Sequence, residues 1–302
     1  MIEKKLKIKK RIRSETVLGY SLVTPAFLII VFVLLVPMIC GIVLSMFNYS
    51  IGSTLESKNF VLFGNYIKMF KDTAAVKAIV VTVLFSVGAF SAELIIGIFI
   101  AEMLTKFTKA RGAILRAICL IPLFVSPIIV GLIWRYMYDP TYGVIYSVLR
   151  SLHINQYFGG LGSTQWALFC VMIADIWQTT PFVIIVATSG ISAISPDIYE
   201  AGRIDGAGNL RLFFKMTLPL MKGVVAVICL IRGVDAFRVF DIIYALTGGG
   251  PANSTLSLSI YSFQVGFSNN EFGYAMAISI FIMVILFAVF GPVLKYTVNN
   301  DD

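Results

Sequence analysis

The chain has 302 residues, of which 58% are hydrophobic and only 13% are charged. Soluble domains carry about 25% charged residues, so the composition excludes an ordinary soluble domain and favours a protein surrounded mostly by lipid. The net charge of +8 does not indicate a nucleic-acid partner, because the basic residues form no stripe with interleaved aromatic residues.

Residues 1–16 are predicted to form a basic tail in the cytoplasm. Their positive charges stand directly before an apolar block, where they would contact anionic membrane lipid. They are Lys4, Lys5, Lys7, Lys9, Lys10, Arg11 and Arg13. The block from Val17 to Phe47 is far longer than a signal-peptide core, and no A-x-A cleavage pattern follows, so we expect it to stay in the protein.

Six apolar segments follow one another, and each is long enough to cross a bilayer, which takes about 20 helical residues. They occupy residues 17–46, 76–102, 113–138, 166–192, 218–246 and 272–296. The third contains Pro122 and Pro127, which neighbouring helices can accommodate inside a membrane. The sequence therefore predicts an all-α, multi-pass protein of the cell membrane with six transmembrane helices.

Lysine and arginine are enriched on the cytoplasmic side of membrane proteins, and here they occur in alternate connections. The cytoplasmic groups are Lys106, Lys109, Arg111 and Arg116, and then Arg203, Arg211, Lys215 and Lys222. The connection at 247–271 has none. The first outer connection carries four lysines and is an exception that we accept because it is long and partly amphipathic. Both termini are predicted to be cytoplasmic.

The inner connection at 194–219 carries the most specific pattern. Ser195 and Pro196 suit the N-cap and first position of a helix, with Glu200 in its early turns. Gly206 should interrupt that helix, and Pro219 should start the fifth crossing. The result would be a short helix–turn–helix that stands off the membrane.

Ile198, Ala201 and Gly202 are spaced i, i+3 and i+4, so one face of this helix would be small. An amphipathic helix lying on the lipid is the alternative, but such a helix would bury large side chains. Small residues instead let the backbone of another protein come close. A cytoplasmic protein partner therefore explains the pattern better.

The run Glu200-Ala201-Gly202-x-x-Asp205-Gly206-Ala207, with Leu218-Pro219 beginning thirteen residues beyond Asp205, resembles the Glu-Ala-Ala loop of ABC importer permeases. The run from Phe240 to Pro251 is similar to the end of the fifth helix in carbohydrate permeases of the maltose and glycerol-3-phosphate type. Gly202 departs from the family pattern, where a second alanine is usual. The substitution keeps the face small but weakens the helix by up to about 1 kcal/mol.

The resemblance implies a type I ABC importer permease (MetI-like) fold over residues 17–302, working as half of a transmembrane pair. A homologous second permease, two ATP-binding subunits and an extracytoplasmic solute-binding protein are the implied partners. In the family this loop docks into the ATPase. The implied coupling residues are Glu200, Ala201, Gly202, Asp205, Gly206 and Pro219.

The chain itself is predicted to be a transport subunit and not an enzyme. No lysine is followed by Ser or Thr, which excludes a P-loop, so ATP and Mg²⁺ would be bound by the partner ATPase. A single histidine and four scattered cysteines indicate no metal site.

Charged residues recur every three positions in the fifth apolar segment, where each unpaired charge would cost about 2.5–3.5 kcal/mol. They are Arg232, Asp235, Arg238 and Asp241. One interpretation is a structural ladder of ion pairs, along the helix or against a neighbouring helix. The other is a polar lining of the substrate path, with hydrogen bonds to sugar hydroxyls. The sequence leaves both open.

Aromatic side chains near these charges could stack on a sugar ring, although packing is their commoner role. The candidates are Phe237, Phe240, Tyr244 and, beside Gln178, Trp177. Glu93, Asp175 and Trp134 are weaker candidates.

The predicted substrate is a sugar or polyol, with glycerol-3-phosphate or another anion as the alternative, because Arg232 and Arg238 would suit phosphate. An ion-coupled secondary transporter is a further alternative. It would usually show inverted repeats and broken helices in matching positions, and the sequence shows neither. A membrane-embedded enzyme would need a cluster of catalytic groups, which only the charged positions approach.

Overall fold

The computed structural model describes residues 17–54, 59–107, 109–153 and 158–299, so the predicted basic tail at 1–16 lies outside the described residues. Within these ranges the chain is helical and has no β-strand beyond an isolated bridge between Phe47 and Phe60. The all-α prediction is confirmed.

The helices are joined by connections of different lengths. They are α2 (Val36–Ser45), α3 (Gly64–Lys71), α4 (Thr73–Thr105), α5 (Lys109–Leu120), α6 (Pro127–Met137), α7 (Val144–Ser151), α8 (Ala167–Ser192), α9 (Pro196–Ile204), α10 (Asn209–Leu212), α11 (Leu218–Leu220), α12 (Lys222–Phe237), α13 (Asp241–Leu246), α14 (Leu258–Phe263) and α15 (Phe272–Asn299). Helix α2 is the end of a longer helix that begins at Val17.

Four helices are long and apolar enough to cross a membrane. They are Val17–Ser45, Thr73–Thr105, Ala167–Ser192 and Phe272–Lys295. Two further pairs are apolar enough when taken together but are bent, Arg111–Phe124 with Pro127–Met137 by 91° and Asn209–Leu220 with Lys222–Leu246 by 69°. The structure thus supports four spans, or up to six if each bent pair is one span.

The third apolar segment is not the single helix that the sequence suggested. A 3₁₀ turn, Ile121–Phe124, ends α5, and Val125 and Ser126 are extended, with ψ of 133° and 137°, before Pro127 begins α6. A residue that precedes proline avoids the helical region, which explains the break at Ser126.

The fifth apolar segment is also interrupted. Helix α12 ends at Phe237, and α13 begins only at Asp241. The charged positions therefore do not lie on one continuous helix, contrary to the sequence-based expectation. Neither this break nor the one before Pro127 was expected from the sequence.

The core is centred on α4 and α8, which lie close together because small residues face the neighbouring helix. A Cβ atom on Gly97 would lie 2.6 Å from Val183, and one on Gly88 would lie 2.9 Å from the sulfur of Met172. Helices α12 and α14 pack against α4, and α15 packs against α12 and α14. The buried side chains of this cluster are apolar.

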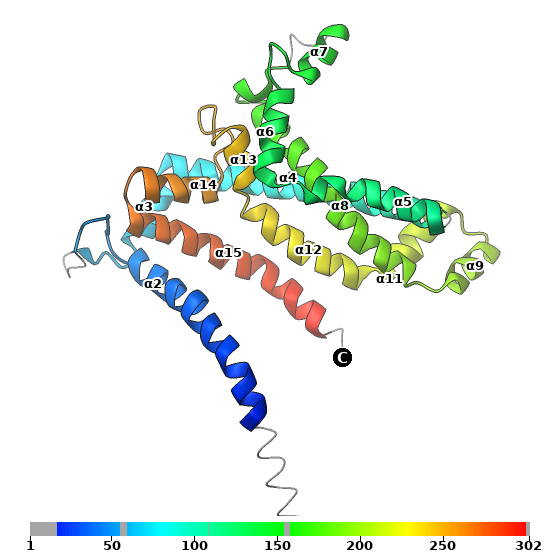
Figure 1. Ribbon diagram of the computed structural model, residues 1–302, viewed down its shortest axis with the longest axis horizontal. Coiled ribbons are helices and arrows are strands. Elements are labelled where there is room, and N and C mark those ends of the chain that lie inside the picture. The colour runs from blue at the N-terminus through cyan, green and yellow to red at the C-terminus, as the bar shows by residue number, and fades with distance from the viewer. Residues whose placement is uncertain (1–16, 55–58, 108, 154–157, 300–302) are drawn as a thin grey trace, which may run out of the picture.

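The molecule is elongated, with α9 at one end and α3 and α14 at the other (Figure 1). The first span, Val17–Ser45, is drawn in blue and points away from the other helices (Figure 1). It contacts α15 through its C-terminal part, α2. Most of its large apolar side chains are exposed in the isolated chain.

The carboxylate of Asp72, at the junction of α3 and α4, links these two helices to α14 and α15. Tyr274 donates a hydrogen bond of 2.9 Å to Asp72, and Tyr261 donates to the same oxygen. Burial raises the pKa of Asp72, but these two bonds and the amides of Ala74 and Ala75 outweigh it and hold the pKa below its usual value. The exposed pair Lys68–Glu271 lies nearby.

Candidate functional site

The segment between α8 and α12 forms an elbow of two short arms at residues 194–219, as the sequence predicted. The Ser195 side chain accepts a hydrogen bond from the Asp197 amide, and Pro196 is the first residue of α9. Helix α9 ends at Ile204, and Gly206 has φ of +78°, a conformation that glycine adopts without steric cost. The second arm runs through α10 to Pro219 in α11.

Gly202 lies on the inner face of the elbow and not on its outer face, which corrects the sequence-based prediction. It is buried, and a Cβ atom there would lie 2.5 Å from Leu212 and 2.9 Å from Met216. A hydrogen bond of 3.1 Å between the hydroxyls of Tyr199 and Thr217 joins the two arms again. Glycine at this position therefore lets the arms pack together.

The outer face of the elbow carries both polar and apolar groups. Glu200, Ala201 and Asp205 are exposed, as predicted. Ile204 is 86% exposed and Leu210 is 76% exposed. Two large apolar side chains free of packing beside an exposed carboxylate form a surface that suits a protein partner.

A buried ion-pair cluster joins α4, α8 and α12. Arg232 donates to both carboxylate oxygens of Glu93, at 2.9 and 3.0 Å, and to Asp175 at 3.4 Å. All three side chains are buried. Arg232 therefore takes part in the structural ion pairing that the sequence left open, but its partners are on neighbouring helices.

A polar cavity of about 550 Å³ lies where the two broken spans meet α8. The walls come from the break before α6, the middle of α8 and the break between α12 and α13. They are lined by Leu123, Val125, Pro127, Asp175, Gln178, Thr179, Arg232, Asp235, Arg238, Val239, Phe240, Asp241 and Ile242. Non-helical backbone at membrane depth is tolerated where it lines such a cavity.

The predicted charged residues that line this cavity differ in their exposure and in their ion-pair partners. Arg238 donates to Asp235 at 3.0 Å, the i, i+3 pair that the sequence indicated. Asp241 is exposed and has no ion pair with any residue in the described ranges. Gln178, which donates to the Val125 carbonyl at 2.8 Å, holds the break in place.

The aromatic candidates separate into three groups. Phe240 lines the cavity and stacks on Tyr244, with ring centroids 5.3 Å apart. Phe237 is buried in the core and does not reach the cavity. Trp177 is half-exposed, packs edge-on against Trp134 and does not line the cavity either; its neighbour Gln178 does.

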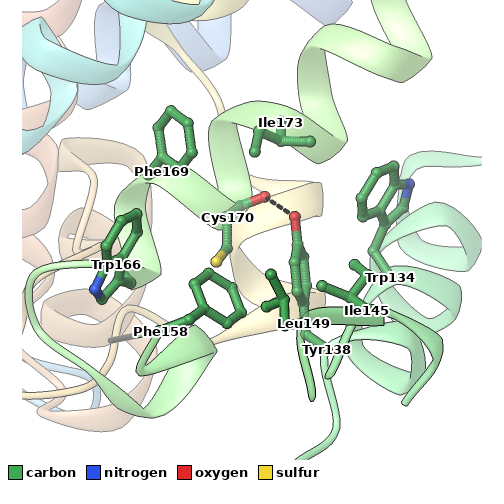
Figure 2. Close-up of a pocket in the computed structure, with 9 residues that line it drawn as sticks. All are labelled: Trp134, Tyr138, Ile145, Leu149, Phe158, Trp166, Phe169, Cys170 and Ile173. Carbon is green, nitrogen blue, oxygen red and sulfur yellow. Dashed lines mark hydrogen bonds between the residues drawn. The ribbon is translucent and has the colours of Figure 1, made fainter. Parts of the chain in front are cut away.

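A second cavity of about 520 Å³ lies between α6, α7 and the start of α8, and its lining is almost entirely apolar (Figure 2). Aromatic rings dominate it, among them Trp134, Phe158 and Trp166. The hydroxyl of Tyr138 donates to the Cys170 carbonyl at 3.2 Å and is therefore not free to bind a solute (Figure 2). This cavity is not suited to a polyhydroxylated solute.

Comparison with known sequences decides the family. Residues 93–299 match the family described as "Binding-protein-dependent transport system inner membrane component", and this match covers the elbow and the polar cavity. The chain belongs to this family. It is therefore an inner-membrane permease subunit of binding-protein-dependent ABC importers, a transport component and not an enzyme.

Curated relatives of the permease match over most of their length. It is 37% identical over 277 residues to the trehalose/maltose transport system permease protein MalF of Thermococcus litoralis, covering 91% of this chain and 92% of the relative. It is 30% identical to the sulfoquinovosyl glycerol transport system permease protein SmoG of Agrobacterium fabrum, covering 95% of this chain and 92% of the relative.

A solved structure has the same fold. The permease superposes with a TM-score of 0.81, at 22% identity, on a chain of a bacterial ABC transporter that imports the acidic polysaccharide alginate. The superposition covers 97% of this permease and 99% of that chain. The MetI-like permease fold predicted from the sequence is confirmed. Within the described ranges, no group of His, Cys, Asp and Glu residues is arranged to hold a metal ion.

Proposed function

We propose that this permease forms half of a sugar-import path and that the elbow at 194–219 couples the path to a separate ATPase. It would work with a homologous second permease, two ATP-binding subunits that hold ATP and Mg²⁺, and an extracytoplasmic solute-binding protein. Residues 17–302 would form one membrane domain with six crossings, and the basic tail and both termini would lie in the cytoplasm.

The observation that carries the coupling role is the built shape of the elbow. Gly202 and the Tyr199–Thr217 bond fix the angle between its arms, so a force on α9 is transmitted to α12 through α11. Its exposed face offers Glu200 and Ala201 beside Ile204, which gives a partner both a charge and apolar area. Because α12 carries Arg232 and ends at the cavity, motion of the elbow would reach the solute path.

Replacing Glu200 with alanine is expected to lower ATP-driven uptake by more than about tenfold, because truncating a charged contact at an interface costs about 2–5 kcal/mol. The measurement is uptake into vesicles that contain the assembled transporter. Asp197→Ala is the matched control, since it removes a carboxylate from the same helix three residues away. Equal uptake in both variants would exclude Glu200 from the coupling contact.

The orientation is tested with single cysteines in a background that lacks Cys40, Cys119, Cys170 and Cys229. A membrane-impermeant maleimide should label Ala252→Cys in intact cells and Ala201→Cys only after the membrane is opened. Both positions are exposed. The opposite labelling pattern would reverse the proposed orientation.

The sugar path is supported by the polar cavity and by the relatives. Helix breaks expose backbone there, and Asp235, Arg238 and Asp241 line it beside the aromatic ring of Phe240. Carboxylates and guanidinium groups hydrogen-bond to hydroxyls, and an aromatic face suits a sugar ring. Several relatives are named as permeases for trehalose, maltose or other saccharides.

A further inference from the structure

The charge of the sugar is not decided by family membership. One relative is named for trehalose and maltose, which are neutral, and another for sulfoquinovosyl glycerol, which is anionic. The structural neighbour imports acidic alginate. The charges of the cavity itself are therefore the observation that distinguishes these substrates.

The two arginines of the cavity already have carboxylate partners. Arg232 is held by Glu93 and Asp175 in the buried cluster, and its side chain is 9% exposed. Arg238 is more open, at 64% exposure, but it is paired with Asp235. Both guanidinium groups already have a carboxylate counter-charge, so an anionic solute would have to share Arg238 with Asp235 and would meet no unpaired positive charge.

The carboxylates outnumber the guanidinium groups. Asp175, Asp235 and Asp241 line the cavity, and Glu93 lies directly behind Arg232. Four carboxylates thus face two arginines, and no lysine or histidine lines this cavity among the described residues. Even if one carboxylate at Arg232 carried a proton, the cavity would hold no uncompensated positive charge.

The free hydrogen-bonding groups also favour hydroxyls. An ionised carboxylate only accepts hydrogen bonds, so Asp241 and the open oxygen of Asp235 require donors from the solute. A sugar hydroxyl supplies that donor and can also accept from the remaining N–H groups of Arg238. A phosphate, sulfonate or uronate group supplies no donor when ionised and would be repelled by the excess of carboxylates.

We propose that this permease selects uncharged sugars and rejects anionic ones, with Asp235 and Asp241 as the specificity-determining residues. The inference rests on the proposed sugar path. It excludes glycerol-3-phosphate and acidic saccharides, the alternative that the two arginines suggested from sequence.

The test compares trehalose with trehalose 6-phosphate, which have the same rings and differ in charge. Equilibrium binding of each is measured on the transporter purified from its native membrane into lipid nanodiscs, without the solute-binding protein. The wild type should bind the phosphate at least about tenfold more weakly than trehalose. Asp235→Asn, which leaves Arg238 unpaired, and Asp241→Asn should each reduce that ratio by about tenfold.

Asp139→Asn is the matched control, because it neutralises one partly exposed carboxylate outside the cavity, keeps an oxygen that can accept from the amides of Thr141 and Tyr142, and should leave the ratio unchanged. Asp241 is exposed and Asp235 and Asp139 are partly exposed, so the substitutions do not disturb the core. Wild-type binding of the phosphate as tight as that of trehalose, or an unchanged ratio in both cavity variants, would overturn the inference and leave the sugar path standing. Binding of neither compound would overturn the sugar path along with the inference.

Discussion

Replacing Gly206 with proline is expected to abolish uptake while the protein still enters the membrane. Gly206 has φ of +78°, whereas proline is held near −65°, so the elbow cannot keep its bend. The substitution also removes the amide that donates to the Arg203 carbonyl at 3.0 Å. With the bend lost, α9 would present Glu200 and Ala201 in a different direction, and the ATPase would no longer move α12. Uptake and membrane-inserted protein are measured on the same vesicles.

Gly208→Pro is the matched control, because φ at Gly208 is −70°, within the range of proline, and no atom lies within 4 Å of an added Cβ. It should retain most of the uptake. Normal uptake by the Gly206 variant would show that the bend is not part of the coupling mechanism. Loss of both variants from the membrane fraction would contradict the expectation that the elbow is dispensable for insertion.

Replacing Arg232 with methionine is expected to destabilise the protein by about 3–5 kcal/mol, because Glu93 and Asp175 would be left buried without a counter-charge. The fully buried Glu93 accepts two hydrogen bonds from Arg232 and cannot reach water in the present fold. Thermal unfolding in detergent and the yield of folded protein measure the effect.

Lys68→Met is the control for this second experiment, since it also removes one member of an ion pair. Lys68 and Glu271 are 48% and 42% exposed, so the loss should be no more than about 1 kcal/mol. Similar unfolding temperatures for the two variants would mean that the buried cluster does not stabilise the protein. A change in solute preference with unchanged stability would instead place Arg232 in the solute path.

The contrast between Arg232 and Asp235 shows how far the sequence could be taken. The i, i+3 spacing correctly paired Asp235 with Arg238, because both side chains lie on adjacent turns. The same spacing suggested Asp235 as a partner for Arg232. In the structure Arg232 instead contacts Glu93, which is 139 positions away, and Asp175. Local spacing carries no information about which residue of a neighbouring helix lies opposite.

Gly202 gives the same lesson within the elbow. The sequence placed a small residue there and correctly identified the N-cap at Ser195 and the break at Gly206, since these depend on local backbone preferences. It assigned Gly202 to the outer face, although the side chains of Leu212 and Met216 occupy the space beside it. The direction that a residue faces depends on where the second arm returns.

Apolar length, basic connections and capping residues determined by themselves that this chain is a helical membrane protein with an elbow between its fourth and fifth apolar segments. These features depend on the free energy of transferring each apolar segment to lipid and on the local conformational preferences of its backbone. Both are properties of the segment itself and do not depend on its neighbours. Only the tertiary structure decided that the third and fifth apolar segments are interrupted, that the breaks before α6 and between α12 and α13 meet at one polar cavity, and that its arginines are already paired with carboxylates. Those results depend on the contacts between helices distant in sequence, which no single segment specifies.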